Sequence, residues 1–419
     1  MSAGRGLALA PFAVRSFRYQ WASDLLVSLS FEMETLVLGW YVLVETDSVI
    51  VLGIFGSLQY LGSLLAPLTG VLGDRIGSRR MLLSMRAVCA LLALLILVLA
   101  TTGLLSPMVV LAIALVTGLL RPTEYVMRLA LVGEIIAPDA LLGAMGLSRI
   151  NIDVARIAGA LTGAGLFASF GLSLCYVFIA VFYALGVACT FGIAPPHRVG
   201  GKAGEVASGG TERPAPVARA PGWQELKAGM AQVWNIPSVL AIMWLAFLVN
   251  LTAFPVTVGL LPYVAKEIYG IDQVGLGHIV SAFSFGSLAG AVLMSFWGAR
   301  LHANRAMMVT TVLWYLALLA FALVETKGAG IGLLFLIGLF QSIAMITSLT
   351  ALLNDTGEEF RARIMGVRML AVYGLPVGLA GAGYLISVAG FVPTTLAYVA
   401  VGLVVTLYIG VRWRRQLWH

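Results

Sequence analysis

Ionisable side chains lie within long apolar stretches of this 419-residue sequence, and they gather in its first half. If those stretches cross a bilayer, a charge near the midplane costs at least about 2.5–3.5 kcal/mol to insert, so such residues usually serve a function. A carboxylate in that setting can carry a proton, and an arginine can bind an anion or neutralise the carboxylate. The candidates for proton coupling or substrate binding are Asp24, Glu32, Glu34, Arg121, Glu124, Arg149, Asp153 and Arg156.

The acidic residues of the first stretch, residues 18–45, differ in depth and direction. With a rise of about 1.5 Å per residue, the middle of a helix over this stretch falls near Phe31. Glu32 then lies close to the midplane, and Asp24 lies about two turns nearer the N-terminal end. At about 100° per residue, Glu34 points roughly 160° away from Glu32. We therefore expect Glu32 to be the deep protonatable residue and Glu34 to pair with a neighbouring helix.

Two later stretches carry stripes of alternating charge, each with arginine, acid and arginine on one face of a helix. The stripes are Arg121, Glu124 and Arg128, and Arg149, Asp153 and Arg156. One interpretation is a structural lattice of ion pairs between these two helices. The other is a site in which Arg121, Asp153 and Arg156 bind an anionic group or exchange a proton with Glu32. A further arginine, Arg86, is expected to snorkel toward the membrane surface.

The composition excludes a water-soluble protein. Hydrophobic residues make up 60% of the chain and charged residues 11%, whereas a soluble domain is about a quarter charged. Continuous apolar runs, each long enough to cross a bilayer, predict an all-α integral membrane protein with twelve transmembrane helices. The runs are 18–45, 49–72, 81–102, 107–131, 143–168, 172–193, 236–261, 275–297, 306–324, 329–352, 363–388 and 391–411.

A polar stretch divides these runs into six and six. Its middle is rich in Gly, Pro and Ser, and its end has the amphipathic pattern of a helix on a membrane surface. We therefore expect an N-terminal bundle (1–193), a cytoplasmic linker (194–235) and a C-terminal bundle (236–419). Basic residues outside the runs fall on one side, with Lys266 and Lys327 as the exceptions. This bias predicts a multi-pass plasma-membrane protein with both termini in the cytoplasm.

A repeated loop motif relates the two halves. The segment 70–80 reads GVLGDRIGSRR, and the segment 298–305 reads GARLHANR in the corresponding loop of the second half. Two copies in corresponding loops imply duplication of a six-helix unit. With this motif the sequence resembles the major facilitator superfamily, whose loop between helices 2 and 3 carries G-x-L-x-D-R-x-G-x-R-R. The matching gating residues are Gly70, Asp74, Arg75, Gly77, Arg79 and Arg80.

The resemblance implies two pseudo-symmetric six-helix bundles and a latch on the inner side, in which Asp74 meets the N-terminal end of the helix that starts near residues 361–364. Short segments at 121–122, 138–142, 361–366 and 374–378 resemble the drug- and siderophore-exporting branch, which includes the enterobactin exporter and macrolide efflux proteins. Antiporters of the superfamily usually carry Gly-Pro in the fifth helix, where this chain has Gly159-Ala160. Pro and Gly in two later helices mark expected gating hinges. They are Pro255, Gly374, Pro376 and Gly378.

The expected function is proton-coupled export of a small organic molecule (a drug, siderophore or anionic metabolite) by alternating access, driven by inward proton flow through Glu32. Five arginines within the N-terminal runs favour an acidic cargo. An importer of a siderophore complex or organic anion is the alternative, and a non-transporting scaffold or sensor is the third hypothesis. The sequence has no ATP-binding P-loop and no catalytic or metal-ligand pattern. We therefore expect no enzyme activity, cofactor, metal or nucleic-acid partner, and a monomer whose partners are its cargo, protons and lipid.

Overall fold

A computed structural model describes residues 10–64, 76–137, 140–194, 230–231, 233–356 and 361–418, and these ranges form helices joined by short turns. The first half contains a 3-10 turn, η1 (Ala10–Ala13), and the helices that follow it. They are α2 (Arg15–Thr46), α3 (Val49–Leu58), η2 (Leu61–Leu64), α5 (Ser78–Thr101), α6 (Pro107–Ile135) and α7 (Leu141–Phe191).

The second half begins with a seventh span that is divided into short pieces. They are α9 (Pro237–Thr252), α10 (Phe254–Val258), α11 (Leu261–Tyr263) and the π-helical turn η3 (Val264–Ile268). The remaining elements are α12 (Gln273–Trp297), η4 (Gly298–Arg300), α13 (Ala303–Leu323), α14 (Lys327–Asn354), α15 (Arg361–Ala371), α16 (Gly374–Ala389), α17 (Phe391–Arg412) and α18 (Arg414–Leu417).

Polar residues and glycines set several of the helix ends. The hydroxyls of Ser48 and Ser106 accept hydrogen bonds from the backbone N–H groups at the starts of α3 and α6. The Asp272 carboxylate does the same for α12, at 2.9 Å from the Gly275 nitrogen. Such side-chain acceptors satisfy N–H groups that a helix leaves without a partner in its first turn.

Helix α7 contains two membrane spans. Its 51 residues would extend about 76 Å at 1.5 Å per residue, far more than the ~30 Å hydrocarbon core of a bilayer. The chain reverses at Gly171, where φ is 76° and ψ is −179°, a backbone conformation open mainly to glycine. This turn lies where the sequence predicts the boundary between the fifth and sixth spans.

Twelve spans are therefore accounted for in the described part of the chain. Nine helices there are long and apolar enough to cross a membrane, with α7 counted once and α15–α16 counted together. Dividing α7 at Gly171 adds one, and the shorter apolar helices Val49–Ser63 and Pro237–Thr252 supply the second and seventh spans. The predicted all-α membrane architecture is confirmed.

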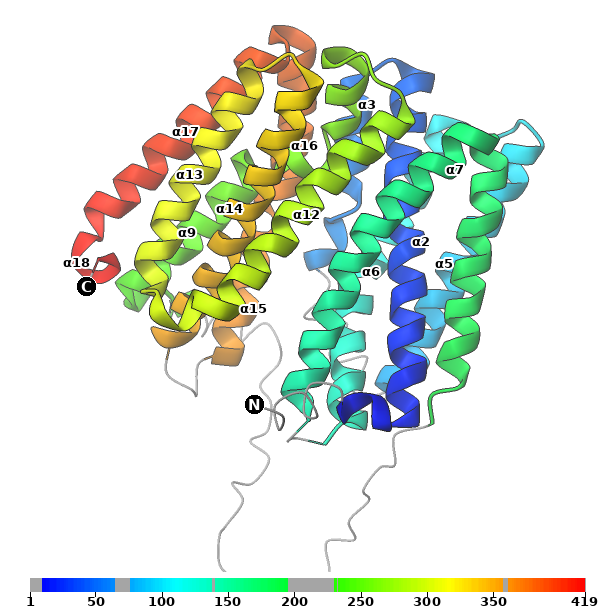
Figure 1. The fold of residues 1–419 in the computed structure, drawn as a ribbon, viewed down its shortest axis with the longest axis horizontal. Coiled ribbons are helices and arrows are strands. Elements are labelled where there is room, and N and C mark those ends of the chain that lie inside the picture. Colours follow the sequence, from blue (N-terminus) through cyan, green and yellow to red (C-terminus); the bar gives the residue numbers. More distant parts are fainter. Residues whose placement is uncertain are drawn as a thin grey trace, which may run out of the picture.

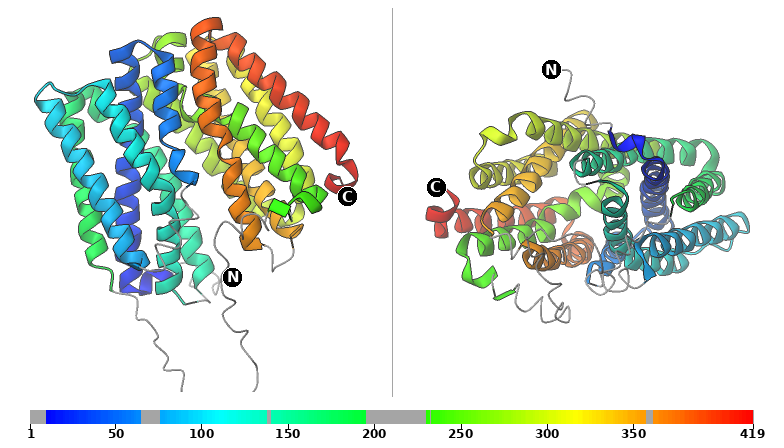
Figure 2. Two further views of the ribbon diagram at one scale, coloured as in Figure 1. Left: turned by 180° about the vertical axis from the view of Figure 1, so that it is seen from behind. Right: turned by 90° about the horizontal axis from the view of Figure 1, so that it is seen from below.

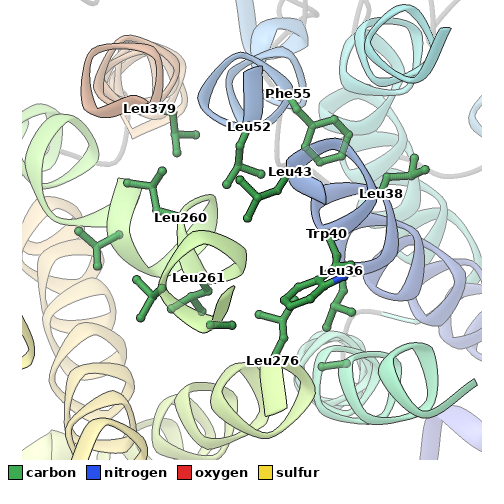
Figure 3. Packing of buried hydrophobic residues seen from close by; sticks show 14 of the residues in the cluster. Leu36, Leu38, Trp40, Leu43, Leu52, Phe55, Leu260, Leu261, Leu276 and Leu379 are labelled. Carbon is green, nitrogen blue, oxygen red and sulfur yellow. The ribbon is translucent and has the colours of Figure 1, made fainter. Parts of the chain in front are cut away.

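The twelve spans form two bundles that meet at one end and diverge toward the other (Figure 1; Figure 2). We call the end at which α2 begins and α17 ends the terminal face, and the other end the opposite face. Near the opposite face α3 packs against α16, and α12 packs against α7. Leucines of both halves meet there in one apolar cluster, with Leu52 of α3 beside Leu379 of α16 (Figure 3).

Glycines let the two bundles approach closely. A Cβ atom on Gly53 of α3 would lie 2.7 Å from the Leu379 carbonyl oxygen and 3.2 Å from Gly383 Cα. A Cβ atom on Gly277 of α12 would lie 2.6 Å from the Ala164 methyl group of α7. Side chains at these positions would separate the helices, so the close contact depends on glycine.

The expected hinges lie at interruptions of the helices. The seventh span breaks at Ala253, just before Pro255, and the eleventh span breaks between Ala371 and Gly374, just before Pro376. The Ser57 hydroxyl of α3 donates a 2.8 Å hydrogen bond to the Pro376 carbonyl oxygen. Gly378 lies against the Leu251 carbonyl oxygen of α9. These breaks provide points for bending, and the gating role of the four residues stays a prediction.

The expected latch falls mostly outside the described residues. Gly70, Asp74 and Arg75 belong to residues 65–75, which lie outside them. Gly77 has φ of 93° at the start of α5, and the Arg79 guanidinium donates a 2.9 Å hydrogen bond to the Phe191 carbonyl oxygen at the end of α7. Arg80 is exposed at the terminal face.

Candidate functional site

A cavity of about 330 Å³ lies between the two bundles, and both halves line it. We call it the central cavity. Its volume falls at the lower end of the range of small-molecule sites, about 300–1,000 Å³. The wall from the N-terminal half carries all of its ionisable groups apart from tyrosine: Glu32, Arg121 and Arg156.

These three residues form a loosely paired charged triad. Glu32 Oε1 lies 3.4 Å from Arg121 Nη2 and 3.9 Å from Arg156 Nε. The Arg121 and Arg156 side chains are 36% and 30% exposed, and that of Glu32 is 17% exposed. Two guanidinium groups thus share one carboxylate, so the triad carries one uncompensated positive charge when Glu32 is ionised. In a membrane interior such a charge attracts an anionic partner.

The backbone of α7 comes close to Glu32. A Cβ atom on Gly159 would lie 2.8 Å from Glu32 Cβ, and one on Gly163 would lie 3.0 Å from Met33 Cα. The two glycines therefore allow α2 and α7 to pack closely. Arg156 lies one turn before Gly159 on the same helix, and this packing brings its guanidinium within reach of Glu32.

The wall from the C-terminal half is neutral. Phe254 and Phe283 supply aromatic surface, and Asn250, Thr257 and Gln341 supply polar groups. Asn250 and Thr257 hydrogen-bond to carbonyl oxygens of their own helices. The Gln341 carboxamide oxygen is buried and has no hydrogen-bond partner among the described residues. As a lining residue, Gln341 contributes a carboxamide that can hydrogen-bond to a ligand.

A second charged group is fully packed inside the N-terminal bundle. Arg86 of α5 is completely buried and pairs with Asp24 of α2 and with Glu124 of α6, the latter at 2.9 Å. Its guanidinium also donates to the hydroxyls of Ser23 (2.5 Å) and Thr190 (3.0 Å). The expectation that Arg86 snorkels is wrong, because acids on two neighbouring helices neutralise it in place.

Arg128 completes this group, which we call the buried cluster (Asp24, Arg86, Glu124 and Arg128). Arg128 lies 3.4 Å from Glu124 and 3.5 Å from Asp24, and it donates a 3.0 Å hydrogen bond to Ser28. The cluster links α2, α5 and α6. A lattice between the fourth and fifth spans was one expectation for the charge stripes. Among the described residues, ion pairs instead tie the fourth span to the first and third.

Three predicted site residues line neither the central cavity nor the second cavity described below. Asp24 belongs to the buried cluster. The Glu34 carboxylate accepts a 2.9 Å hydrogen bond from the Tyr183 hydroxyl and is buried. Asp153 is buried beside Arg149, at 3.2 Å, one turn along the same helix. The expectation that Asp153 shares a site with Arg121 and Arg156 is therefore wrong, because its carboxylate turns toward Arg149.

A second cavity, of about 260 Å³, lies inside the N-terminal bundle. We call it the side cavity. Glu124 and Arg149 line it, together with Ser28, Cys89, Arg128 and Ile152. It shares Phe31, Glu32, Arg121 and Arg156 with the central cavity. The charged triad therefore forms the partition between the two cavities.

Sequence reasoning missed several neutral residues of the central cavity: Thr35, Gln59, Tyr60 and Thr257. The Thr35 hydroxyl lies 3.4 Å from the Gln59 carboxamide oxygen. Two features of the sequence could have identified some of these residues. Thr35 follows Glu32 by three residues and so shares its helix face, and Gln59-Tyr60 is a polar pair in an otherwise apolar run.

An ion pair joins the halves outside the membrane-spanning segments, at the opposite face. Lys266 Nζ lies 2.6 Å from Asp47 Oδ1. The hydrogen bond and charge of Lys266 lower the pKa of the Asp47 carboxyl, and the hydrogen bonds that Lys266 donates to Asp47 and Glu267 raise the pKa of Lys266. Both groups are therefore ionised over the neutral range.

Comparison with solved structures identifies the fold. A variant of the nucleoside transporter NupG matches with a TM-score of 0.73 at 13% identity, covering 94% of this chain and 99% of that chain. A bacterial homologue of the human lysosomal transporter Spinster, in an inward-facing and unoccupied conformation, matches with a TM-score of 0.73 at 13% identity, over 96% and 98%. The POT family transporter PepTSo matches with a TM-score of 0.74 at 12% identity, over 96% and 98%.

Sequence comparison identifies the family. No curated protein matches the chain in sequence. The family model described as "Transmembrane secretion effector" matches residues 7–418, nearly the whole chain. The chain is thus a multi-pass membrane protein and a secondary transporter by family, and it belongs to the transmembrane secretion effector family of the major facilitator superfamily.

Proposed function

We propose that this protein exports a small organic acid by proton-coupled alternating access, with Glu32 as the coupling carboxylate. The observation that carries the proposal is the triad: Glu32 is the acid that lines the central cavity among the described residues, and it holds two partly exposed arginines loosely. Family membership supports transport and sets aside the scaffold or sensor alternative.

The walls of the central cavity support a cargo with three features. An acidic group fits beside Arg121 and Arg156, because the triad has one positive charge in excess. A hydrogen-bonding group fits beside the Gln341 carboxamide across the cavity. An apolar or aromatic body fits between them, against Phe254 and Phe283. The arginine count alone overstated the acidic preference, since Arg86 and Arg128 are already neutralised in the buried cluster.

The triad also supports a sign of coupling, which differs from the inward proton flow expected from the sequence. Protonation of Glu32 frees both arginines for the acidic group of the cargo, and a bound anion in turn raises the affinity of Glu32 for a proton. Cargo anion and proton therefore bind together and move in the same direction. Export then requires that the outward concentration gradient of the cargo exceed the opposing pH gradient. Exchange of cargo for an inward proton would instead require a cargo that competes with the proton.

Proton-coupled uptake of an organic anion is the second candidate. The same observation favours it, because a carrier that binds anion and proton together also runs inward when the proton gradient exceeds that of the cargo. The bias of basic residues toward the terminal face supports placing both termini in the cytoplasm. In that orientation the bundles diverge toward the cytoplasm and this conformation loads cargo from inside.

The coupling test compares two glutamates two residues apart. In proteoliposomes, Glu32→Gln should abolish proton movement during transport of an organic acid. Glu34→Gln should retain it, because Glu34 faces Tyr183 rather than the cavity. An internal pH dye reports the proton flux. Undiminished coupling in Glu32→Gln contradicts the proposal, as does equal loss of coupling in both variants while both remain folded.

The direction test uses vesicles of both orientations. Inside-out vesicles loaded from the terminal side should accumulate organic acid together with protons. Acidification of the lumen during accumulation supports movement of cargo and proton together, and alkalinisation contradicts it. Steady accumulation only in right-side-out vesicles favours the uptake candidate.

A further inference from the structure

We propose that the side cavity is a water-filled proton route between Glu32 and the terminal face, separate from the path of the cargo. The inference rests on the proposed coupling role of Glu32 and adds the path by which its proton leaves. The geometry that carries it is the shared partition, in which Glu32 lines both cavities.

The two cavities extend from Glu32 in opposite directions along the membrane normal. On α2, the central cavity continues from Glu32 to Thr35, Leu36 and Gly39, toward the opposite face. The side cavity continues from Glu32 back to Ser28 and Val27, toward the terminal face. On α6 the side cavity is lined by Thr117 and Leu120 as well as by Glu124 and Arg128, and the last two bring it nearer the terminal face than the central cavity, which meets α6 at Arg121.

The side cavity can hold water. Its volume of about 260 Å³ compares with about 30 Å³ for one molecule of liquid water. Polar groups line it on three helices, and a water site needs two to four polar partners. At its rim the Arg149 side chain is 55% exposed, and Tyr125 is 40% exposed. These two exposed residues line the side cavity but not the central cavity, so the side cavity can open to the surface beside them.

The partition keeps cargo out of the side cavity. The Arg121 guanidinium lies over the Phe31 ring, and both groups line both cavities. A cargo held by Arg121 and Arg156 in the central cavity therefore leaves the far side of Glu32 open to water. The charged and titratable groups around Glu32 are Arg121 of α6, Arg156 of α7 and Tyr60 after α3, with Glu124 and Arg128 deeper in the side cavity.

The proton step is simple. The neutral Glu32 carboxylic acid transfers its proton to a water molecule of the side cavity, and the resulting carboxylate pairs again with Arg121 and Arg156. The proton leaves along the water toward the terminal face, so no other reactant is needed. In the uptake direction cargo and proton are thus released on the same side by different routes, and in the export direction the same water route carries the proton from the terminal face to Glu32.

Cys89 provides a natural probe, because it lines the side cavity, whereas Cys175 is fully buried elsewhere. With Cys175 and Cys189 replaced by Ser, a membrane-impermeant anionic methanethiosulfonate added at the terminal face should modify Cys89. Thr35→Trp fills the central cavity and should leave the modification rate unchanged. Ile152→Trp fills the side cavity and should lower that rate by at least about tenfold. Ile150→Trp, which adds the same ring on an exposed surface, is the matched control.

Time-resolved infrared spectroscopy after a pH jump measures the proton itself, with Glu32→Gln identifying the Glu32 carboxyl band. Ile152→Trp should slow loss of this band by at least about tenfold, and Thr35→Trp and Ile150→Trp should not. The opposite ranking, slowing by Thr35→Trp alone, overturns the side-cavity route. Equal slowing of Cys89 modification by Ile152→Trp and Thr35→Trp also overturns it. Absence of a titrating Glu32 band contradicts the proposed function, whereas Cys89 reactivity tests the route independently.

Discussion

The buried cluster and the charged triad use the same residue types on overlapping helices, yet their packing differs. In the cluster, two acids and two arginines balance, Arg86 is fully buried, and its contact with Glu124 is 2.9 Å. In the triad, one acid serves two arginines at 3.4 and 3.9 Å, and Arg121 remains 36% exposed. Balanced, closely packed charges can only hold helices together. An unbalanced, loosely held set can exchange partners, which is what binding and coupling require.

The largest expected effect comes from breaking the buried cluster. Arg86→Met leaves Asp24 and Glu124 without their main positive partner, and removal of one partner from a buried pair costs about 3–5 kcal/mol. Thermal unfolding in detergent should show this loss. Arg80→Met, on the exposed end of the same helix, should leave unfolding unchanged. Equal stability of the two variants would contradict the structural role of the cluster.

A smaller and different effect is expected from the triad. Arg121→Gln removes a charged hydrogen-bond donor worth about 1.5–3 kcal/mol, which corresponds to roughly 10- to 100-fold weaker binding of an acidic cargo. Stability should change little, because Arg121 is partly exposed. Isothermal titration with an organic acid checks the affinity. Arg149→Gln, which alters the side cavity only, should keep it. If both variants weakened cargo binding equally, the assignment of cargo to the central cavity alone would be contradicted.

The packing that positions the triad can be tested at a glycine. Gly159→Ala places a methyl group 2.8 Å from Glu32 Cβ, and overpacking of this kind costs about 1–3 kcal/mol. We expect weaker proton coupling together with reduced thermal stability. Gly165→Ala on the same helix meets nothing within 4 Å and should be neutral in both measurements. Full coupling in Gly159→Ala would show that the Glu32–Arg156 distance is unimportant.

The smallest effect is expected at the exposed Asp47–Lys266 pair. Asp47→Asn should slightly reduce the population in which the halves meet at the opposite face, measured as the distance between spin labels at the terminal face. Since the pKa of Asp47 is lowered, the pair is complete above the ordinary aspartate pKa of about 3.9 and is lost only as pH falls through the lowered value. Between about pH 5 and 8 the spin-label distance should therefore stay constant. A dependence on pH in that window that Asp47→Asn abolishes would contradict this assignment.

The sequence predicted the fold well because each membrane span is a continuous apolar segment, which can be recognised without knowing what it packs against. The boundary near Gly171 was predictable for the same reason. The short pieces of the seventh span were not predicted, although Pro255 marked the position of its break. The polar linker and most of the expected latch lie outside the described residues, so these expectations stay predictions.

The site was harder to predict because burial of a charge depends on other helices. Depth and helix angle separated Glu32 from Glu34, since both are properties of one helix. The partners of Arg86 lie on α2 and α6, and no pattern within α5 reveals them. Likewise, the direction of Asp153 toward Arg149 or toward the cavity depends on rotation of the fifth span within the bundle. Neutral residues such as Gln59 entered the cavity wall through packing between halves.

The near contact of Gly53 and Gly383 backbones has a consequence for the living membrane. The contact that closes the opposite face consists mostly of two closely packed helix backbones and apolar side chains. Its strength therefore depends little on the concentration of dissolved ions. Bilayer thickness acts on helix tilt, and tilt changes how closely two such backbones meet. A cell that lengthens or shortens its lipid acyl chains would thereby retune the resting balance of this carrier between its two conformations.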